Sequence, residues 1–172
     1  MINQIKKSVL TMMGIGYFPY FPGTVASFLT CIIFYFLWAF IGIKNLILPF
    51  VFFLIILSIY SVILINKFYK KEDAKEIVVD EFIGQSIPLL AFFDTDLHLR
   101  LHYFLLNTPF DLHVTEIWIL LSFILFRFFD IFKPFPINLI DLKIKNGFGV
   151  VLDDIVAGIF ATISIYILLL WI

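Results

Sequence analysis

Residues 46–65 read LILPFVFFLIILSIYSVILI, a run of twenty residues without a single charged side chain. At ~1.5 Å of rise per residue, a helix of about twenty residues crosses the ~30 Å hydrocarbon core of a bilayer. Apolar runs of this length are too long for a soluble domain. The run therefore predicts a membrane-spanning helix, and it decides the class of the whole chain.

The composition agrees with a membrane protein. Of the 172 residues, 62% are hydrophobic and only 15% are charged, whereas soluble domains carry about 25% charged residues. Residues 8–43 form a second stretch without a charge. The net charge of −1 gives no basic surface for nucleic acid. We therefore expect an all-α fold and a single membrane-embedded domain over residues 1–172.

The expected helices follow the apolar runs. Residues 2–13 have apolar side chains at helical spacing beside two lysines, which is typical of a short helix lying in the membrane interface. Long apolar helices are expected at about residues 24–43, 46–65, 114–129 and 150–172. A shorter stretch over residues 77–93 is interrupted by Asp80 and Glu81. The sequence thus predicts a multi-pass protein with four to five apolar helices.

The segments between these helices are expected to be irregular. Residues 14–23 are rich in Gly, Pro and aromatic residues and predict an entry loop before the first span. In residues 94–113 leucines alternate with polar residues, which opposes a helix and, with it, a metal pair formed by His98 and His102. Residues 131–149 contain two prolines and predict another loop.

The positions of lysine and arginine predict the orientation, because cytoplasmic loops collect these residues. With the N-terminus inside, ten of the twelve lie on the cytoplasmic side, and only Lys44 and Arg100 lie outside. This arrangement requires residues 77–93 to cross, or nearly cross, the bilayer, and a re-entrant helix would also satisfy it.

In this orientation, polar side chains from four segments fall at the same cytoplasmic level. They are Thr24 and Ser27 in the first span, Asp80 and Glu81 in the short third helix, Arg127, Asp130 and Lys133 at the end of the fourth, and Asp153 and Asp154 in the last. Carboxylates in or beside membrane helices are costly unless they are paired, metal-bound or hydrated. Five carboxylates at one depth therefore predict a built site rather than separate helix caps.

The chemistry of this set favours a phosphate and a hard cation. Crowded carboxylates repel one another unless a cation or protons intervene, and Mg²⁺ binds a few carboxylates together with water and substrate phosphate. The expected metal ligands are Asp80, Glu81, Asp130, Asp153 and Asp154. All of these except Asp153 are also expected to take catalytic roles, either as the base for water or as an attacking carboxylate.

The same level offers groups that would bind the phosphate. Arg127 and Lys133 would hold phosphate oxygens, the arginine through its bidentate fork. The N-terminus of the first span, with Thr24 and Ser27, adds a second place that favours negative charge.

At these residues the sequence resembles the phosphatidylglycerophosphatase A family. The matching pieces are residues 22–24 with Ser27, DEFIG at 80–84, FRFFDI at 126–131, KPFPI at 133–137 and DDIVAG at 153–158. They occur in the order of the family and cover most of the chain. The chain departs from the family at Ala26, where glycine is usual, and in a longer stretch between Glu81 and Arg127.

This resemblance implies an all-helical enzyme of the bacterial inner membrane with its active site facing the cytoplasm. Such an enzyme removes the terminal phosphate of phosphatidylglycerophosphate and gives phosphatidylglycerol and inorganic phosphate. The family depends on Mg²⁺. The implied partners are this substrate and membrane lipid.

Other classes of function stay open at this point. Carboxylates inside a membrane also mark ion-coupled transporters, although a transporter would place polar residues through the whole depth of the bilayer. In a non-catalytic assembly protein, replacing Asp80 or Asp154 by Asn would leave any cellular phenotype intact. A phosphohistidine mechanism is disfavoured, because all three histidines fall on the predicted outer side.

Overall fold

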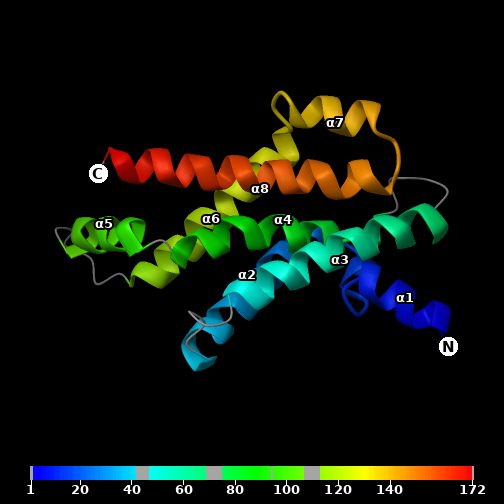
Figure 1. Cartoon of the computed structure of the whole chain (residues 1–172), viewed down its shortest axis with the longest axis horizontal. Helices are drawn as coiled ribbons and strands as arrows, with labels where there is room; N and C mark the ends of the chain where they lie inside the picture. The colour runs from blue at the N-terminus through cyan, green and yellow to red at the C-terminus, as the bar shows by residue number, and fades with distance from the viewer. Residues whose placement is uncertain (1, 42–46, 69–74, 94, 107–112, 172) are drawn as a thin grey trace.

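The computed structural model describes residues 2–41, 47–68, 75–93, 95–106 and 113–171. Every regular element in this part of the chain is helical, which confirms the all-α prediction (Figure 1). The elements in order are α1 (Ile2–Leu10), η1 (Ile15–Tyr17), α2 (Pro22–Ile41), α3 (Ile47–Phe68), α4 (Val79–Leu90), η3 (Ala91–Phe93), α5 (Thr95–Leu106), α6 (Val114–Phe132), α7 (Ile137–Lys143) and α8 (Gly147–Leu170).

Three of these helices, α2, α3 and α8, are long and apolar enough to cross a membrane. Most of their exposed side chains are apolar, as lipid contact requires; Phe52 on α3 and Ile163 on α8 are examples. Helix α6 has nineteen residues, but it carries Glu116, Arg127 and Asp130. The predicted number of four to five apolar helices is therefore approximate.

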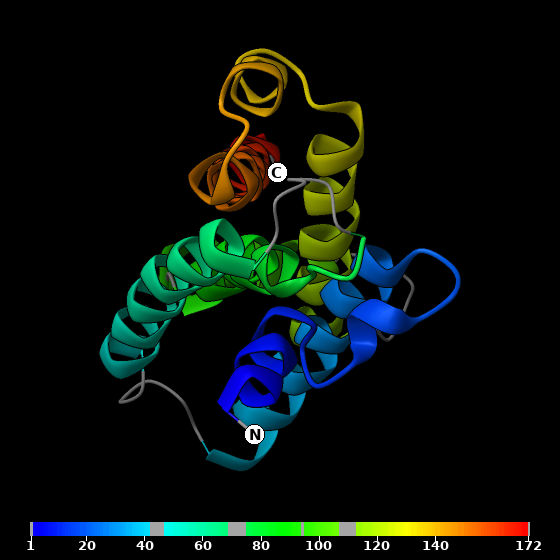
Figure 2. The same ribbon diagram turned by 90° about the vertical axis from the view of Figure 1, so that its right-hand side faces the viewer.

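Helix α4 occupies the centre of the bundle, where it contacts α2, α3, α6 and α8 (Figure 2). Its twelve residues cover ~18 Å at ~1.5 Å per residue, which is too short for a ~30 Å hydrocarbon core. The 3-10 turn η3 follows directly. A re-entrant segment agrees with this length, whereas α4 alone does not span.

Helices α4 and α8 cross at two glycines. A Cβ on Gly84 would collide with the backbone carbonyl of Asp154, and a Cβ on Gly158 would collide with the carbonyl oxygen of Gly84. Such small residues let two helix backbones approach closely in a membrane protein. Because Asp80 and Asp154 each precede one of these glycines by one turn, the crossing brings the two acidic helix starts together.

Helix α5 lies where the sequence predicted irregular chain, and that prediction is wrong. Leu97, Leu101 and Leu105 recur every four residues and are all buried in one hydrophobic cluster. This helical stripe outweighs the local alternation with polar residues. His98 and His102 are thus one turn apart on a helix, with His102 exposed; the side chain of His98 lies outside the described part.

Helix α7 lies within the predicted loop of residues 131–149 and corrects that expectation in part. Its first residue, Ile137, is fully buried between α6 and α8, which fixes the short helix against the bundle. Helix α6 ends as Pro134 predicts: Lys133 caps it in a left-handed backbone conformation with φ 42°.

The start of α8 is fixed by two asparagines. The side chain of Asn146 accepts hydrogen bonds from the backbone N–H groups of Phe148 and Gly149, at 3.0 and 3.1 Å. The N–H of Gly147 donates to Asn66 Oδ1 of α3, at 2.7 Å. These bonds satisfy N–H groups that a helix start leaves without partners, and they set the position of the acids about two turns further along α8.

Candidate active site

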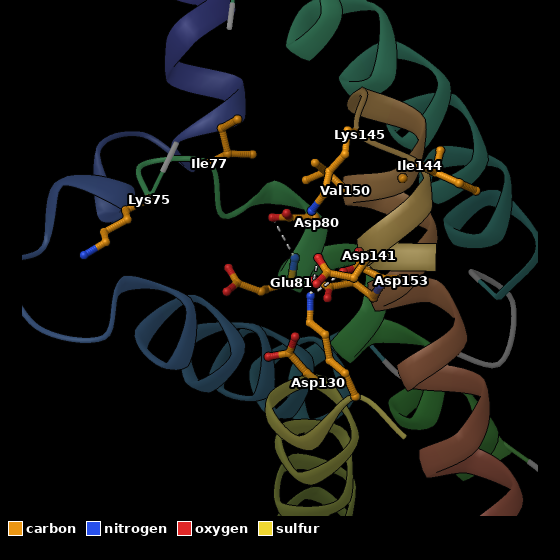
Figure 3. A pocket seen from close by; sticks show the side chains of 13 residues that line it. Lys75, Ile77, Asp80, Glu81, Asp130, Asp141, Ile144, Lys145, Val150 and Asp153 are labelled. Carbon is orange, nitrogen blue, oxygen red and sulfur yellow. Dashed lines mark hydrogen bonds and ion pairs between the residues drawn. The ribbon is translucent and has the colours of Figure 1, made fainter. Parts of the chain in front are cut away.

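A cavity of about 230 Å³ opens where α4 and α8 begin and α6 ends (Figure 3). Its acidic lining residues are Asp80 and Glu81 of α4, Asp130 of α6, Asp141 of α7, and Asp153 and Asp154 of α8. Lys75, Lys133 and Lys145 line it as well. The structure thus brings all five predicted acids, and Lys133, to one place.

Lys133 joins α6, α7 and α8 across this cavity. Its Nζ donates to Asp153 Oδ2 at 2.6 Å and lies 3.0 Å from Asp141 Oδ1. Burial lowers the pKa of Lys133, but the hydrogen bonds and charges of the two carboxylates outweigh burial and raise this pKa above its usual value. The ammonium group is therefore charged at neutral pH.

The left-handed backbone of Lys133 costs on the order of 1 kcal/mol for a residue with a Cβ. Such a constraint is often found at functional sites.

Arg127 lies beside the cavity and joins α6 to α2 and α4. Its Nη1 lies 2.6 Å from Asp130 Oδ2 and 3.7 Å from Glu81 Oε1. The same nitrogen donates to Ser27 Oγ at 3.4 Å, and that hydroxyl donates to the carbonyl of Gly23 at 3.0 Å. The guanidinium group thus neutralises part of the acidic set and connects it with the start of α2.

The entry to α2 packs directly on the acidic set. A Cβ on Gly23 would collide with the carboxylate of Glu81, so glycine at this position leaves room for the Glu81 side chain beside the start of α2. Thr24 follows in the first turn of α2 and is half-buried, but it does not line the cavity. Its part in substrate binding stays a prediction.

Asp80 and Asp153 have the same local geometry on their two helices. Each carboxylate accepts a hydrogen bond at 3.1 Å from the backbone N–H of the acid that follows it, Glu81 or Asp154. The bond holds the first carboxylate against its own backbone. The two acid pairs therefore present similar arrangements from α4 and α8 to one cavity.

The donor chemistry of the cavity fits Mg²⁺, since its lining offers carboxylate oxygens and no sulfur. Oε2 of Glu81 is buried and has no hydrogen-bond partner among the described residues. Within the same part of the chain, no three Asp, Glu, His or Cys side chains form a complete metal cage. Mg²⁺ commonly uses one or two carboxylates plus water and substrate phosphate, so the predicted ligand set stays a prediction.

Asp141 is the acidic member of the cavity that the sequence reasoning missed. It lies on α7, four residues after the buried Ile137, and residues four apart share one face of a helix. That spacing was the available signal. Reading residues 131–149 as a loop concealed it.

The histidines lie away from the cavity. Helix α5 packs through its leucines against Ile165 and Leu169, and Figure 1 shows it beside the C-terminal end of α8. The cavity is lined by Asp153 and Asp154, near the N-terminal end of α8. His102 and His113 are exposed, and neither of them lines the cavity.

Comparison with known proteins gives the family of the chain. The family model of phosphatidylglycerophosphatase A matches residues 8–169. A Haemophilus influenzae protein named phosphatidylglycerophosphatase A is 40% identical over 99 residues, which cover 58% of this chain and 49% of that protein. An Escherichia coli protein of the same name is 31% identical over 153 residues, covering 89% of this chain and 77% of that protein.

A further relative has a different name. The Bacteroides thetaiotaomicron protein "Putative phosphatidylinositol-3-phosphatase" is 31% identical over 157 residues, which cover 90% of this chain and 87% of that protein. The chain thus aligns with about half the length of the Haemophilus protein and with most of the other two. No solved structure matches the chain. Because the family match includes every helix that lines the cavity, the chain belongs to the phosphatidylglycerophosphatase A family.

Proposed function

We propose that this chain hydrolyses the terminal phosphate of phosphatidylglycerophosphate to give phosphatidylglycerol and inorganic phosphate. The observation that carries the proposal is that five predicted acids and Lys133 line one cavity, at one end of a bundle of largely apolar helices. A lipid phosphomonoester matches both parts, since its acyl chains stay in the bilayer while its headgroup enters a polar cavity. Family membership supports the same activity.

In this proposal the two basic residues hold the phosphate. Lys133 lines the cavity and would donate to phosphate oxygens, and Arg127 would offset the charge that develops in the transition state. One of Asp80, Glu81, Asp130 and Asp154 acts either as the base for a water molecule or as the attacking carboxylate. In both routes the bond between phosphorus and the glycerol oxygen breaks, and that oxygen gains a proton. In the second route, water then hydrolyses the acyl phosphate, which releases inorganic phosphate and regenerates the carboxylate.

Mg²⁺ is the proposed cofactor, held by acids chosen from Asp80, Glu81, Asp130, Asp153 and Asp154. When bound, it would polarise the phosphoryl oxygens and offset their charge. The proposed location of the cavity is the cytoplasmic face of a bacterial inner membrane, and its support is the predicted bias of ten lysine and arginine residues toward that side. Of the residues in that comparison, Lys44, Lys70 and Lys71 lie outside the described part.

The test is phosphate release by the purified protein in detergent, with Mg²⁺ and after chelation. Phosphatidylglycerophosphate and phosphatidylinositol 3-phosphate are offered in parallel, because the Bacteroides relative carries the second name. Phosphate release from the first lipid alone, lost on chelation and restored by Mg²⁺, supports the proposal. Release from neither lipid contradicts it, and release from the inositol lipid alone changes the substrate.

Neither the family nor these relatives support the alternative function of an ion-coupled transporter.

A further inference from the structure

A second hollow of about 680 Å³ lies between α2 and α6, and its lining is almost wholly apolar. Helix α2 contributes Phe28, Ile32 and Phe36, and helix α6 contributes Glu116, Leu120 and Phe123. These side chains recur at three- and four-residue intervals, so each helix presents one continuous stripe to the hollow. We call it the α2–α6 groove.

The groove begins one helical turn from the candidate active site. Phe28 directly follows Ser27, whose hydroxyl accepts a hydrogen bond from Arg127. Phe123 precedes Arg127 by four residues, and the rings of Phe28 and Phe123 meet edge to face with centroids 6.1 Å apart. The apolar lining is therefore continuous with the residues that hold Glu81 and Asp130.

The length of the groove corresponds to one leaflet of a bilayer. From Phe28 to Phe36, α2 rises ~12 Å at ~1.5 Å per residue, which is close to half of a ~30 Å hydrocarbon core. Glu116 marks the end of the lining that is distant from Arg127. The side chains of Phe28 and Leu120 are 56% and 52% exposed, so the groove opens to the surrounding lipid.

We propose that the α2–α6 groove holds one acyl chain of the lipid substrate while the headgroup occupies the carboxylate cavity. The inference rests on the proposed function. The phosphodiester and glycerol that connect the acyl chains to the terminal phosphate would lie beside Arg127. They would span the one turn of α6 that separates the groove from the cavity. Lipid tails are as apolar as the helices, so the concave shape of the groove, rather than hydrophobicity, distinguishes a bound chain from bulk lipid.

A second apolar groove offers an internal control. It lies between α3 and α8, measures about 310 Å³ and includes Ile59, Ile63 and Phe148. It is the smaller of the two. Leu152 and Ile155 of its lining flank Asp153 and Asp154, so it also reaches the carboxylate cavity, but it contains no residue of α2 or α6, the helices whose Ser27 and Arg127 contact each other. Ile32 and Ile59 are both exposed isoleucines, at 36% and 58%, so the same substitution can be made in each groove.

The kinetic test fills each groove with tryptophan. Ile32→Trp and Leu120→Trp act from the two walls of the α2–α6 groove, and Ile59→Trp is the matched control. Phosphate release is measured in micelles with dipalmitoyl and dioctanoyl phosphatidylglycerophosphate. We expect kcat/KM for the long-chain lipid to fall roughly fivefold or more in the first two variants, with a smaller loss for the short-chain lipid, since a bulky ring removes the contacts of the distal methylenes.

Two results would overturn the inference in this assay. One is equal behaviour of all three variants toward both lipids. The other is a chain-length effect in Ile59→Trp alone, which would place the chain in the α3–α8 groove.

A labelling experiment separates this inference from the proposed function. The wild-type protein is irradiated with a phosphatidylglycerol that carries a diazirine in one acyl chain, and labelled peptides are identified by mass spectrometry. Label concentrated in residues 28–36 and 116–123 supports the groove even if no phosphate is released in the activity assay. Label spread evenly over α3 and α8, or a crosslink joining two copies of the chain through α2 and α6, excludes it.

Discussion

The two ends of the bundle are built from the same helices and differ in almost every physical property. At one end α4, α6 and α8 bring five carboxylates to a cavity, where they meet Asp141 of α7 and three lysines, one of which caps α6. At the other end the same helices bury Leu89, Trp118 and Ile165 in an apolar cluster with α5. The acidic end accumulates charge repulsion, whereas the apolar end supplies packing. The comparison indicates that function and stability are concentrated at opposite ends of three shared helices.

The largest expected effect comes from neutralising one acid in the cavity, which tests whether catalysis depends on the acidic end of the bundle. We expect Asp154→Asn to lower kcat for phosphatidylglycerophosphate by ~10³-fold, because loss of a catalytic carboxylate removes a base, a nucleophile or a ligand. The thermal midpoint of unfolding in detergent should stay the same or rise, since Asp154 is 4% exposed and removing one of several buried like charges relieves repulsion.

The matched control for this variant is Asp96→Asn. Asp96 is an exposed acid on α5, at the apolar end of the bundle, and its replacement should keep kcat near that of the wild-type protein. Equal loss of activity in both variants would show that the cavity has no special part in catalysis.

The reverse experiment removes packing from the apolar end. Trp118 is fully buried, its ring meets Phe92 edge to face at 5.6 Å, and its Nε1 donates to the carbonyl of Pro88 at 3.0 Å. We expect Trp118→Ala to destabilise the protein by ~3–5 kcal/mol, the range for large aromatic residues removed from a core.

The measurement for this variant is unfolding in detergent, together with phosphate release at low temperature. The folded fraction should keep most of its kcat, because the cavity lies at the other end of α6. Trp118→Phe, which keeps most of the ring, should show a smaller loss of stability. A specific loss of kcat in well-folded Trp118→Ala protein would contradict the separation of the two ends.

The crossing of α4 and α8 joins the two ends, and it is the place where stability and activity should change together. A Cβ on Gly158 would collide with the carbonyl oxygen of Gly84, so Gly158→Ala must separate the helices. Overpacking of this kind typically costs ~1–3 kcal/mol. We also expect lower kcat, because the acids of α4 and α8 would move apart. Thr162→Ala, one turn further along α8, is the control, and an active, stable Gly158→Ala protein would contradict the crossing.

How much the sequence predicts also differs between the ends. The acidic end is visible in the sequence, because charged residues stand out against apolar runs and recur at helix ends. The apolar end is not, because the leucine stripe of α5 is interleaved with polar residues that suggest another period. Only packing against Trp118 and Ile165 decides between the two periods.

The depth of α4 and the partners of Lys133 depend on three-dimensional contacts. Residues 77–93 have an apolar composition that fits a short span, but α4 ends at Leu90 and continues as a 3-10 turn. Helix α7 has only seven residues, fewer than two full turns, which is too little for a periodic signal. The spacing of Ile137 and Asp141 is therefore a weak signal by itself, and the ion pair between Lys133 and Asp141 follows from the fold.

Replacing Asp141 should have the smallest effect on activity, and it allows a comparison of the two carboxylates that contact Lys133. Lys133 donates to both Asp141 and Asp153, but Asp141 is the more exposed partner, with 37% of its side chain accessible against 6% for Asp153. Exposed ion pairs contribute ~0–1 kcal/mol. We therefore expect Asp141→Asn to raise KM only a few-fold and to leave kcat nearly unchanged, since Asp153 still holds the ammonium group in the cavity.

Steady-state phosphate release on Asp141→Asn, Asp153→Asn and the double variant measures this difference. The single change at Asp153 should cost far more than the change at Asp141. In the double variant Lys133 loses both carboxylates, so the loss should exceed the product of the two single losses. A strictly multiplicative result would mean that the two acids act independently, and that Lys133 is not positioned by them jointly.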